Sequence, residues 1–232
     1  MHYLNIFRRI VFLSALWACP LALADDYIVE MIFFAHEGNN WEPSVHAQKQ
    51  SPHQPDIQSA IPLNDSAVFY DFLPLSENEF RLHDLANLLT TSGKYRVMQH
   101  VAWLQPGLAK EAAIPVRIQA GKDFNDTFKE LKPIQVDSSN AAELGKISVR
   151  ELDGTVKVFL ARYLHVFTDL IYRRPSGSKA LPSTEFDSSG QDLHLTEHAL
   201  KAHRKMRSEE LHYIDHPLFG ILVEIRSAEN ED

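Results

Sequence analysis

Apolar side chains recur at every second position in several stretches of the chain, which is the period of a β-strand. Residues 26–36 are apolar on both faces, so we expect this strand to lie in the centre of its sheet. Residues 95–104 alternate and end before a Gln-Pro-Gly turn. Residues 153–170 alternate throughout and predict one unusually long strand, and residues 219–225 predict the last strand. The pattern therefore favours a protein built largely on β-sheet.

One stretch has the helical period instead. Ser76 and Glu79 have the spacing of a capping box, in which each side chain accepts a hydrogen bond from the backbone of the other residue. Gly93 is placed to end the helix. The apolar stripe between them consists of Leu82, Leu85, Ala86 and Leu89. These signals predict one helix, which begins at the capping box.

The pattern is weaker in the segments between these elements. Residues 37–63 contain four prolines among polar residues and predict a long irregular loop. Residues 114–118 predict a short strand. Residues 124–131 fit either a turn of helix or a loop, and residues 138–144 fit a short helix.

Two later segments complete the prediction. Residues 176–190 are rich in Ser, Gly and Pro and predict a loop, whereas residues 193–206 fit helix or strand, and we favour an extended segment. One helix among several strands, without regular strand–helix–strand units, predicts an α+β fold on a mainly antiparallel sheet. No repeat or linker divides the chain, so we expect a single domain over residues 25–232, with the loop at 37–63.

The first 24 residues are expected to form a cleaved signal peptide. Arg8 and Arg9 precede an apolar run, which ends in Ala-Leu-Ala, a small-x-small cleavage site. The run is too short for a membrane span, and no second stretch of spanning length follows. We therefore expect the mature chain to be exported without a transmembrane segment. Lipid anchoring at Cys19 is disfavoured, because bulky Trp17 precedes it and apolar residues follow it.

Removal of the signal peptide changes both the charge and the cysteine content. The segment holds two arginines and no acidic residue, so the formal net charge falls from −8 to −10. This acidity argues against nucleic acid as a partner and against a general attraction to anionic membranes. Cys19 is the only cysteine, so the mature chain is expected to have no disulfide, no thiolate nucleophile and no cysteine metal ligand.

A dense polar and aromatic cluster precedes the last strand. It contains His212, Tyr213, Asp215 and His216, and the following proline disfavours a helical His216, so we expect a bend that enters the strand. Nearby in sequence lies the one basic concentration of the chain, which consists of Lys201, His203, Arg204, Lys205 and Arg207. The simplest interpretation is a structural turn beside a solvated basic face. The alternative is a site that binds carboxylates or sugar hydroxyls by charge-assisted hydrogen bonds.

Aromatic side chains offer a second kind of candidate. Trp103 and Tyr163 can stack on sugar faces, although aromatic residues in strands more often belong to the core.

Two histidine pairs, His194 with His198 and His212 with His216, have the i, i+4 spacing that a zinc site uses on a helix. Neither pair has a glutamate directly after its first histidine, where a metalloprotease places its base, and Pro217 disfavours a helix through the second pair. We therefore predict hydrogen-bonded histidines, no metal, no cofactor and no catalytic residues.

Four segments carry a family resemblance, of which the last is the most specific. They are Ile28–Phe34, Tyr95-Arg96-Val97 with His100–Pro106, Arg162-Tyr163-Leu164-His165, and Met206-Arg207-Ser208 with Leu211–Gly220. In these residues the chain resembles the CsiV-type periplasmic peptidoglycan-binding proteins of Gammaproteobacteria, over about residues 27–225. It departs from the family pattern at Leu104, at Lys205 and in the 37–63 loop.

The resemblance implies a periplasmic protein that binds peptidoglycan and supports a class A penicillin-binding protein through its outer-membrane lipoprotein activator. It implies neither catalysis nor a cofactor. Together with the polar cluster, it predicts a set of ligand-binding residues: Arg207, His212, Tyr213, Asp215, His216, Arg162, Tyr163, His165, His100 and Trp103.

Two other hypotheses stay open beside this binding accessory. The first is a protein-only envelope adaptor, which engages a lipoprotein through an exposed sheet edge or a polar loop without contacting glycan. The second is a metal-dependent peptidoglycan hydrolase, with His212, Asp215 and His216 around the metal.

Overall fold

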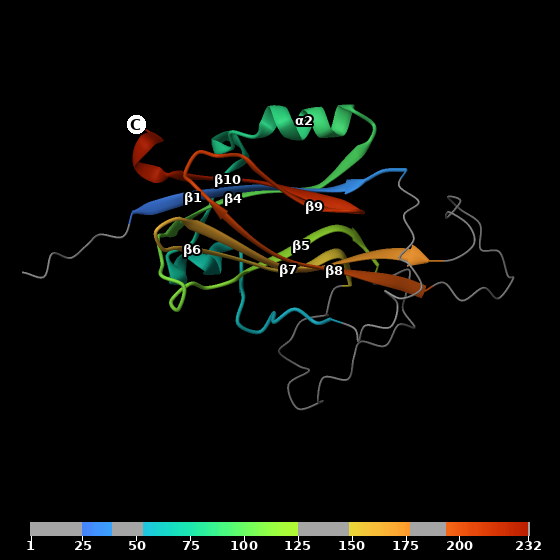
Figure 1. Cartoon of the computed structure of the whole chain (residues 1–232), viewed down its shortest axis with the longest axis horizontal. Coiled ribbons are helices and arrows are strands. Elements are labelled where there is room, and N and C mark those ends of the chain that lie inside the picture. Colours follow the sequence, from blue (N-terminus) through green and yellow to red (C-terminus); the bar gives the residue numbers. More distant parts are fainter. Residues whose placement is uncertain (1–24, 39–52, 125–148, 177–193, 232) are drawn as a thin grey trace, which may run out of the picture.

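The computed structural model describes residues 25–38, 53–124, 149–176 and 194–231. Within these ranges, the chain forms two five-stranded sheets that pack face to face, and one helix lies outside the first sheet (Figure 1). The segments predicted at 124–131, 138–144 and 176–190 lie almost entirely outside the described residues.

Sheet A has the strand order β3-β4-β1-β10-β9, and every pair in it is antiparallel. Its strands are β1 (Asp26–His36), β3 (Leu73–Pro74), β4 (Tyr95–Pro106), β9 (His212–His216) and β10 (Phe219–Ser227). Residues 28–35 of β1 are all buried, and β1 lies between β4 and β10. The predicted central strand is therefore confirmed.

Sheet B has the strand order β2-β5-β6-β7-β8, in which only the β2–β5 pair is parallel. Its strands are β2 (Ile61–Pro62), β5 (Val116–Asp123), β6 (Arg150–Leu160), β7 (Leu164–Ser176) and β8 (His194–Met206). The extended segment favoured near residues 193–206 is confirmed as β8, an edge strand that pairs with β7 along its whole length.

The single long strand predicted over residues 153–170 is wrong, because β6 and β7 form a hairpin. The chain turns at Ala161, Arg162 and Tyr163, where the Ala161 N–H donates to the Tyr163 carbonyl oxygen at 3.0 Å. This turn contains none of the residues that usually signal one, Gly, Pro, Asn or Asp. Because Leu160 and Leu164 face the same side, the alternation passes through the turn in phase.

The inner faces of the two sheets enclose one apolar core. Met31 and Phe33 of β1 and Trp103 of β4 have no exposed surface, and they belong to the same buried cluster as Val156 of β6 and Leu170 of β7. Sheet-on-sheet packing of this kind places alternate side chains of each strand in the core and the others outside. The outer faces of sheets A and B are therefore the two broad surfaces of the sandwich.

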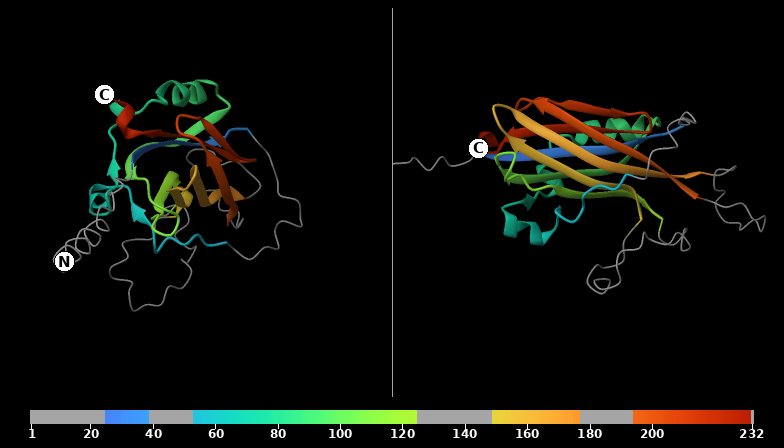
Figure 2. Two further views of the ribbon diagram at one scale, coloured as in Figure 1. Left: turned by 60° about the vertical axis from the view of Figure 1, so that its left-hand side comes forward. Right: turned by 60° about the horizontal axis from the view of Figure 1, so that its bottom comes forward.

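The outer face of sheet A is covered by α2 (His83–Thr91), which lies on one side of the sandwich (Figure 2). Ile32 and Phe34 of β1 form a second buried cluster with Leu82. The predicted stripe packs against this cluster through Leu85, Ala86 and Leu89. The helical stripe is therefore confirmed as the half-buried face of α2 that packs on the sheet.

The predicted start of this helix is wrong. The capping box of Ser76 and Glu79 forms, but it closes a 3-10 turn, η4 (Glu77–Glu79). Phe80 is extended and separates this turn from the helix. Gly93, with a φ of 67°, follows the helix as expected. Two other 3-10 turns are η3 (Asp65–Tyr70) and η5 (Ala228–Glu231).

Residues 212–216 form edge strand β9 and not the predicted bend. An extended strand meets the restriction that Pro217 places on His216 as well as a bend would. The predicted antiparallel character is confirmed, but the α+β class is only partly right. The nine residues of α2 make the longest helix in the described ranges, and the fold there is largely β.

Candidate functional site

The predicted ligand-binding residues do not converge on one place. They divide between the core, the contact beneath α2, edge strand β9 and the outer side of sheet B. The burial and hydrogen bonds of each group show which side chains are available to a ligand and which hold the fold together.

Trp103 lies in the core with no exposed surface. Its Nε1 donates to Oε1 of Gln105 at 2.9 Å, and Gln105 Nε2 donates to the Val158 carbonyl oxygen of sheet B at 3.4 Å. The indole therefore helps to join the two sheets, and it has no face on which a sugar can stack.

A buried ion network that includes His100 holds α2 against sheet A. Glu30 and Arg226 are both fully buried, and Arg226 Nη1 donates to Glu30 Oε2 at 2.9 Å. His100 Nε2 lies 2.8 Å from Glu30 Oε1. The backbone N–H groups of Arg81 and Leu82, just before the helix, donate to the same carboxylate at 2.9 and 2.8 Å.

This network explains the acidity of Glu30. Burial alone would raise the pKa of Glu30, but the hydrogen bonds from His100, the two backbone amides and Arg226 outweigh burial and lower the pKa to about 2. The carboxylate also caps the helix, because it satisfies backbone donors at the N-terminus of α2. The position of His100 is therefore structural.

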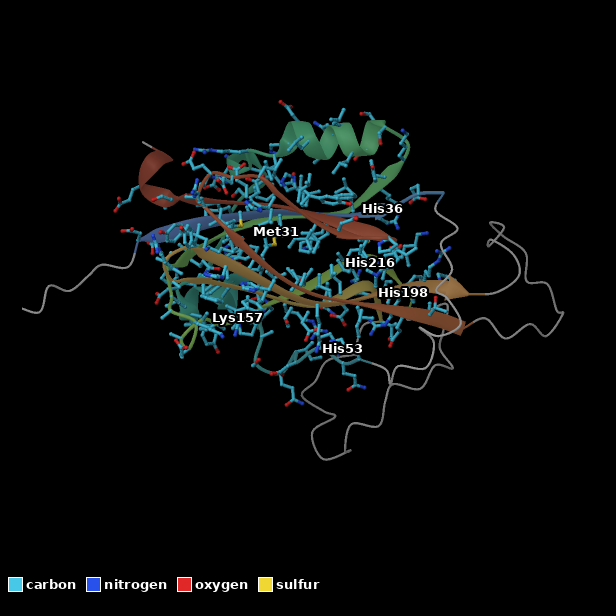
Figure 3. The ribbon with its side chains drawn as sticks, viewed as in Figure 1. Met31, His36, His53, Lys157, His198 and His216 are labelled. Carbon is cyan, nitrogen blue, oxygen red and sulfur yellow. The ribbon has the colours of Figure 1, made fainter. Side chains whose placement is uncertain are left out.

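His216 lies on the inner side of β9, with its ring centroid 4.7 Å from that of Phe219 and 6.3 Å from that of His198 on β8. Figure 3 shows His198 and His216 between the two sheets. The Leu218 N–H donates to His216 Nδ1 at 3.2 Å. Burial, followed by the charge of His198, lowers the pKa of His216 to about 4. The imidazole is therefore neutral near pH 7 and stabilises the β9–β10 turn.

Tyr213 and Asp215 project from the other side of β9. The Tyr213 hydroxyl donates to Asp215, and its ring stacks on Phe34 with centroids 6.0 Å apart. Burial and the hydrogen bond to Asp215 raise the pKa of Tyr213. His212 Nε2 lies 3.2 Å from Glu210 Oε2. The polar groups of the cluster thus bind one another or close neighbours, an arrangement that stabilises an edge strand.

The outer face of sheet B carries a grid of polar and aromatic side chains from β6, β7 and β8. Residues one row apart on a strand are about 7 Å from each other, and neighbours across strands are about 5 Å apart, so the grid is one surface. By register, its rows are Thr155–Asp169–Lys201, Lys157–Phe167–His203 and Phe159–His165–Lys205. In the described part of the chain, no helix covers this face (Figure 1).

A groove of about 640 Å³ crosses this face. Lys157, Phe167 and His203 line it from the sheet, and the segments around Asp56 and Pro115 line it from outside the sheet. Figure 3 shows Lys157 and His53 on the side of sheet B that faces away from sheet A. The groove is thus a concave feature on the face that α2 leaves uncovered.

The acidic groups of the groove already have partners. Asp169 binds His53, and Lys201 Nζ lies 3.8 Å from Asp169 Oδ2. Asp56 accepts a hydrogen bond from the Ser59 hydroxyl at 3.2 Å. Lys157, by contrast, has no ion-pair partner among the described residues. The groove therefore presents a cation that no carboxylate of the described chain neutralises.

The aromatic rings of the grid cover one another. Phe167 and His203 stack with centroids 4.0 Å apart, and Phe159 and His165 stack at 4.7 Å. His165 Nδ1 also lies 2.8 Å from His203 Nε2. Burial, then His203 and Lys205, lower the pKa of His165. Because these ring faces contact other rings, the grid offers ring edges and imidazole nitrogens to a ligand.

Three of the predicted residues meet at one end of sheet B. Arg162, Tyr163 and Arg207 line a hollow of about 320 Å³. The Tyr163 ring contacts two cations there, with Lys205 Nζ 3.7 Å and Arg162 Cζ 5.7 Å from its centroid. Lys205 belongs to the grid and contacts the Tyr163 ring, so the basic side chains of the hollow and those of the grid adjoin.

The sequence prediction missed Lys157 and did not connect Phe167 with the basic run. The signal was present, since Lys201, His203 and Lys205 occupy alternate positions, which share one face of a strand. The long-strand interpretation hid the connection, because only the β6–β7 hairpin brings Lys157 beside Phe167.

No group of three or more His, Cys, Asp or Glu side chains within the described ranges is arranged to hold a metal ion. His212 and His216 lie on a strand, where i, i+4 positions are about 13 Å apart, too far to share one ion. The side chain of His194 lies outside the described residues.

Comparison with known proteins adds a family. No helix among the described residues has both the length and the apolar character needed to cross a membrane. Neither curated proteins nor solved structures give a significant match to the chain. A family model described as "Peptidoglycan-binding protein, CsiV" matches residues 10–228, nearly the whole chain. The chain therefore belongs to the CsiV family of peptidoglycan-binding proteins.

Proposed function

We propose that this protein binds peptidoglycan in the periplasm without cleaving it, and that binding takes place on the outer face of sheet B. Family membership supports peptidoglycan as the ligand. The observation that carries the location is the groove of about 640 Å³, which is lined by Lys157, Lys201 and His203 on a face that no described helix covers.

The overall charge makes this local arrangement important. The chain has a formal net charge of −8, so its long-range field repels a wall polymer that carries carboxylates. Screening removes most of that repulsion beyond about 10 Å at ordinary ionic strength, whereas a cation in contact with a carboxylate keeps most of its attraction. Binding therefore depends on the few basic side chains that line the groove.

Co-sedimentation with purified sacculi tests the proposal. The protein is expected in the pellet, and an unrelated acidic periplasmic protein is expected in the supernatant. The same incubation, analysed by chromatography, is expected to release no muropeptides. The absence of enrichment over the acidic control, or the release of muropeptides, would contradict binding without cleavage.

We further propose that binding supports cell-wall synthesis by a class A penicillin-binding protein, through its outer-membrane lipoprotein activator. The family resemblance is the support for this partner. Pull-down from envelope extracts before and after lysozyme digestion tests it. Direct protein contact survives digestion, whereas an association held only by shared peptidoglycan is lost.

A protein-only adaptor is the second candidate, and one observation favours it. In turn η3, Phe69 is 88% exposed, and its neighbours Val68 and Tyr70 are each 50% exposed. Ala67 and Phe72 anchor this turn with no exposed surface, so the apolar side chains are held in place and project outward. Exposed apolar side chains that the fold does not need are typical of protein contacts. Phe69→Ser should then abolish lysozyme-resistant pull-down, and the wild-type protein should not co-sediment with sacculi.

A further inference from the structure

We propose that the groove on the outer face of sheet B binds the carboxylate groups of peptidoglycan stem peptides, and not the faces of the sugars. This assignment rests on the proposed function, and it names the part of peptidoglycan that the groove takes. The charges of the groove, their spacing and the packing of its aromatic rings support the assignment.

The central observation is the unpaired charge of Lys157 within the described chain. This lysine is partly buried, it lines the groove, and it has no acidic partner among the described residues. Charged side chains that lose water contacts are normally paired, because desolvation disfavours an isolated charge. A ligand carboxylate in the groove would supply the missing partner through a charge-assisted hydrogen bond.

A second cation lies at a distance that suits an extended peptide. Lys201 is one row along the strands and two strands across from Lys157, which separates their Cα atoms by about 12 Å. The Lys201 side chain is 62% exposed. An extended chain rises about 3.4 Å per residue, so the carboxylates of a stem tetrapeptide, which are one or two residues apart, lie within about 7 Å of each other, and the flexible side chains of Lys157 and Lys201 can converge on them.

The acidic groups of the groove fit the rest of a peptide. Asp169 is shared by His53 and Lys201, and Asp56 binds Ser59. Each carboxylate has lone pairs left to accept hydrogen bonds from peptide amides or from the ammonium group of a diamino acid. Groups of both signs therefore match a ligand that carries carboxylates and N–H donors along one strand.

Sugar stacking needs an open aromatic face, and each aromatic ring of the grid has a face against another side chain. The faces of Phe167 and Phe159 lie against His203 and His165. Tyr163 holds Lys205 over its ring at 3.7 Å. The rings therefore contribute edges and nitrogen atoms, which favour a polar peptide over a pyranose ring.

Calorimetric titration of the purified protein with four probes tests the assignment. A disaccharide-tetrapeptide muropeptide and the free stem tetrapeptide should bind with similar affinity, whereas chitotetraose, which has no carboxylate, should not bind. Binding of chitotetraose as tightly as the muropeptide would overturn the assignment. Equal affinity for tetra-L-glutamate would also overturn it, because the groove would then select charge alone.

Variants locate the site. Lys157→Ala should weaken muropeptide binding about tenfold, since one charge-assisted hydrogen bond is lost, and Lys157→Arg should retain most of it. Lys94→Ala is the matched control, because it removes an equally charged exposed side chain next to β4 of sheet A. Unchanged melting temperatures verify that each variant is folded.

Sacculus co-sedimentation separates the two proposals. If the wild-type protein binds sacculi and Lys157→Ala with Lys201→Ala binds them equally well, the groove assignment fails and the proposed function stands. If the wild-type protein does not bind sacculi, the proposed function itself fails.

Discussion

On the outer face of sheet A, Glu30 and Arg226 are fully buried beneath α2 and bind each other at 2.9 Å. On the outer face of sheet B, Lys157 lines an open groove and has no acidic partner in the described ranges. The first face uses charge to position a helix, and its groups are satisfied within the chain. The second face leaves charge available to a ligand. Substitutions on sheet A should therefore change stability, and substitutions on sheet B should change binding.

Arg226→Met should have the largest effect. It leaves the Glu30 carboxylate buried without its cation and removes the hydrogen bond from Arg226 to the Glu79 carbonyl oxygen. Breaking one partner of a buried pair typically costs about 3–5 kcal/mol. Urea unfolding measures the loss, and the folded variant should still bind sacculi. A loss below about 1 kcal/mol would show that the buried pair does not hold α2.

Acid should weaken the same contact. The pKa of Glu30 is about 2 in the folded protein, and an unfolded glutamate has a pKa of about 4.3. Because the folded pKa is depressed, this stabilisation is complete above pH 4.3 and is lost as the pH falls through 2. The total is about 3 kcal/mol. Urea unfolding between pH 5 and 2.5 should show it, and Glu30→Gln should flatten that part of the profile.

Protonation of His216 should reduce stability at a higher pH than protonation of Glu30 does. Its folded pKa of about 4 lies below the ordinary value near 6.5, so folding favours the neutral ring. This stabilisation is complete above pH 6.5 and is lost as the pH falls towards 4. Partial solvent contact reduces the effect to about 1–2 kcal/mol. His216→Ala should lower the melting temperature and remove this pH dependence. An unchanged melt with lost sacculus binding would instead assign His216 to recognition.

Glu197→Gln should have the smallest effect. Glu197 accepts a hydrogen bond from Arg173 Nε at 2.7 Å, and its side chain is 38% exposed on β8. Exposed ion pairs contribute about 0.5 kcal/mol, so the change in unfolding free energy should be close to the error of the measurement. A loss as large as that of Arg226→Met would mean that the burial of an ion pair does not determine how much it contributes to stability.

Much of the sheet structure was predictable, because alternation reports a strand wherever one face is buried. Residues 26–36 and 193–206 were assigned in this way. The alternation could not reveal the β6–β7 turn, because Ala161, Arg162 and Tyr163 carry no turn signal and the phase continues across them. A local pattern also could not show where α2 lies on sheet A, since the carboxylate that caps the helix comes from Glu30, 52 residues before Leu82 in sequence.

The candidate site was only partly predictable for the same reason. The basic run near residue 203 was visible as composition. Trp103 and His100 were both among the predicted ligand-binding residues, because a sequence does not show which face of β4 is covered. Burial separates them: the first lies in the core and the second beneath α2.

Amide chemical-shift mapping during titration with the disaccharide-tetrapeptide muropeptide tests the account most directly. We predict shifts on the outward residues of β6, β7 and β8, centred on Lys157, Phe167 and His203, and none in α2. Shifts confined to α2 or to residues 212–216, with no change around Lys157, would contradict the assignment of peptidoglycan to the outer face of sheet B.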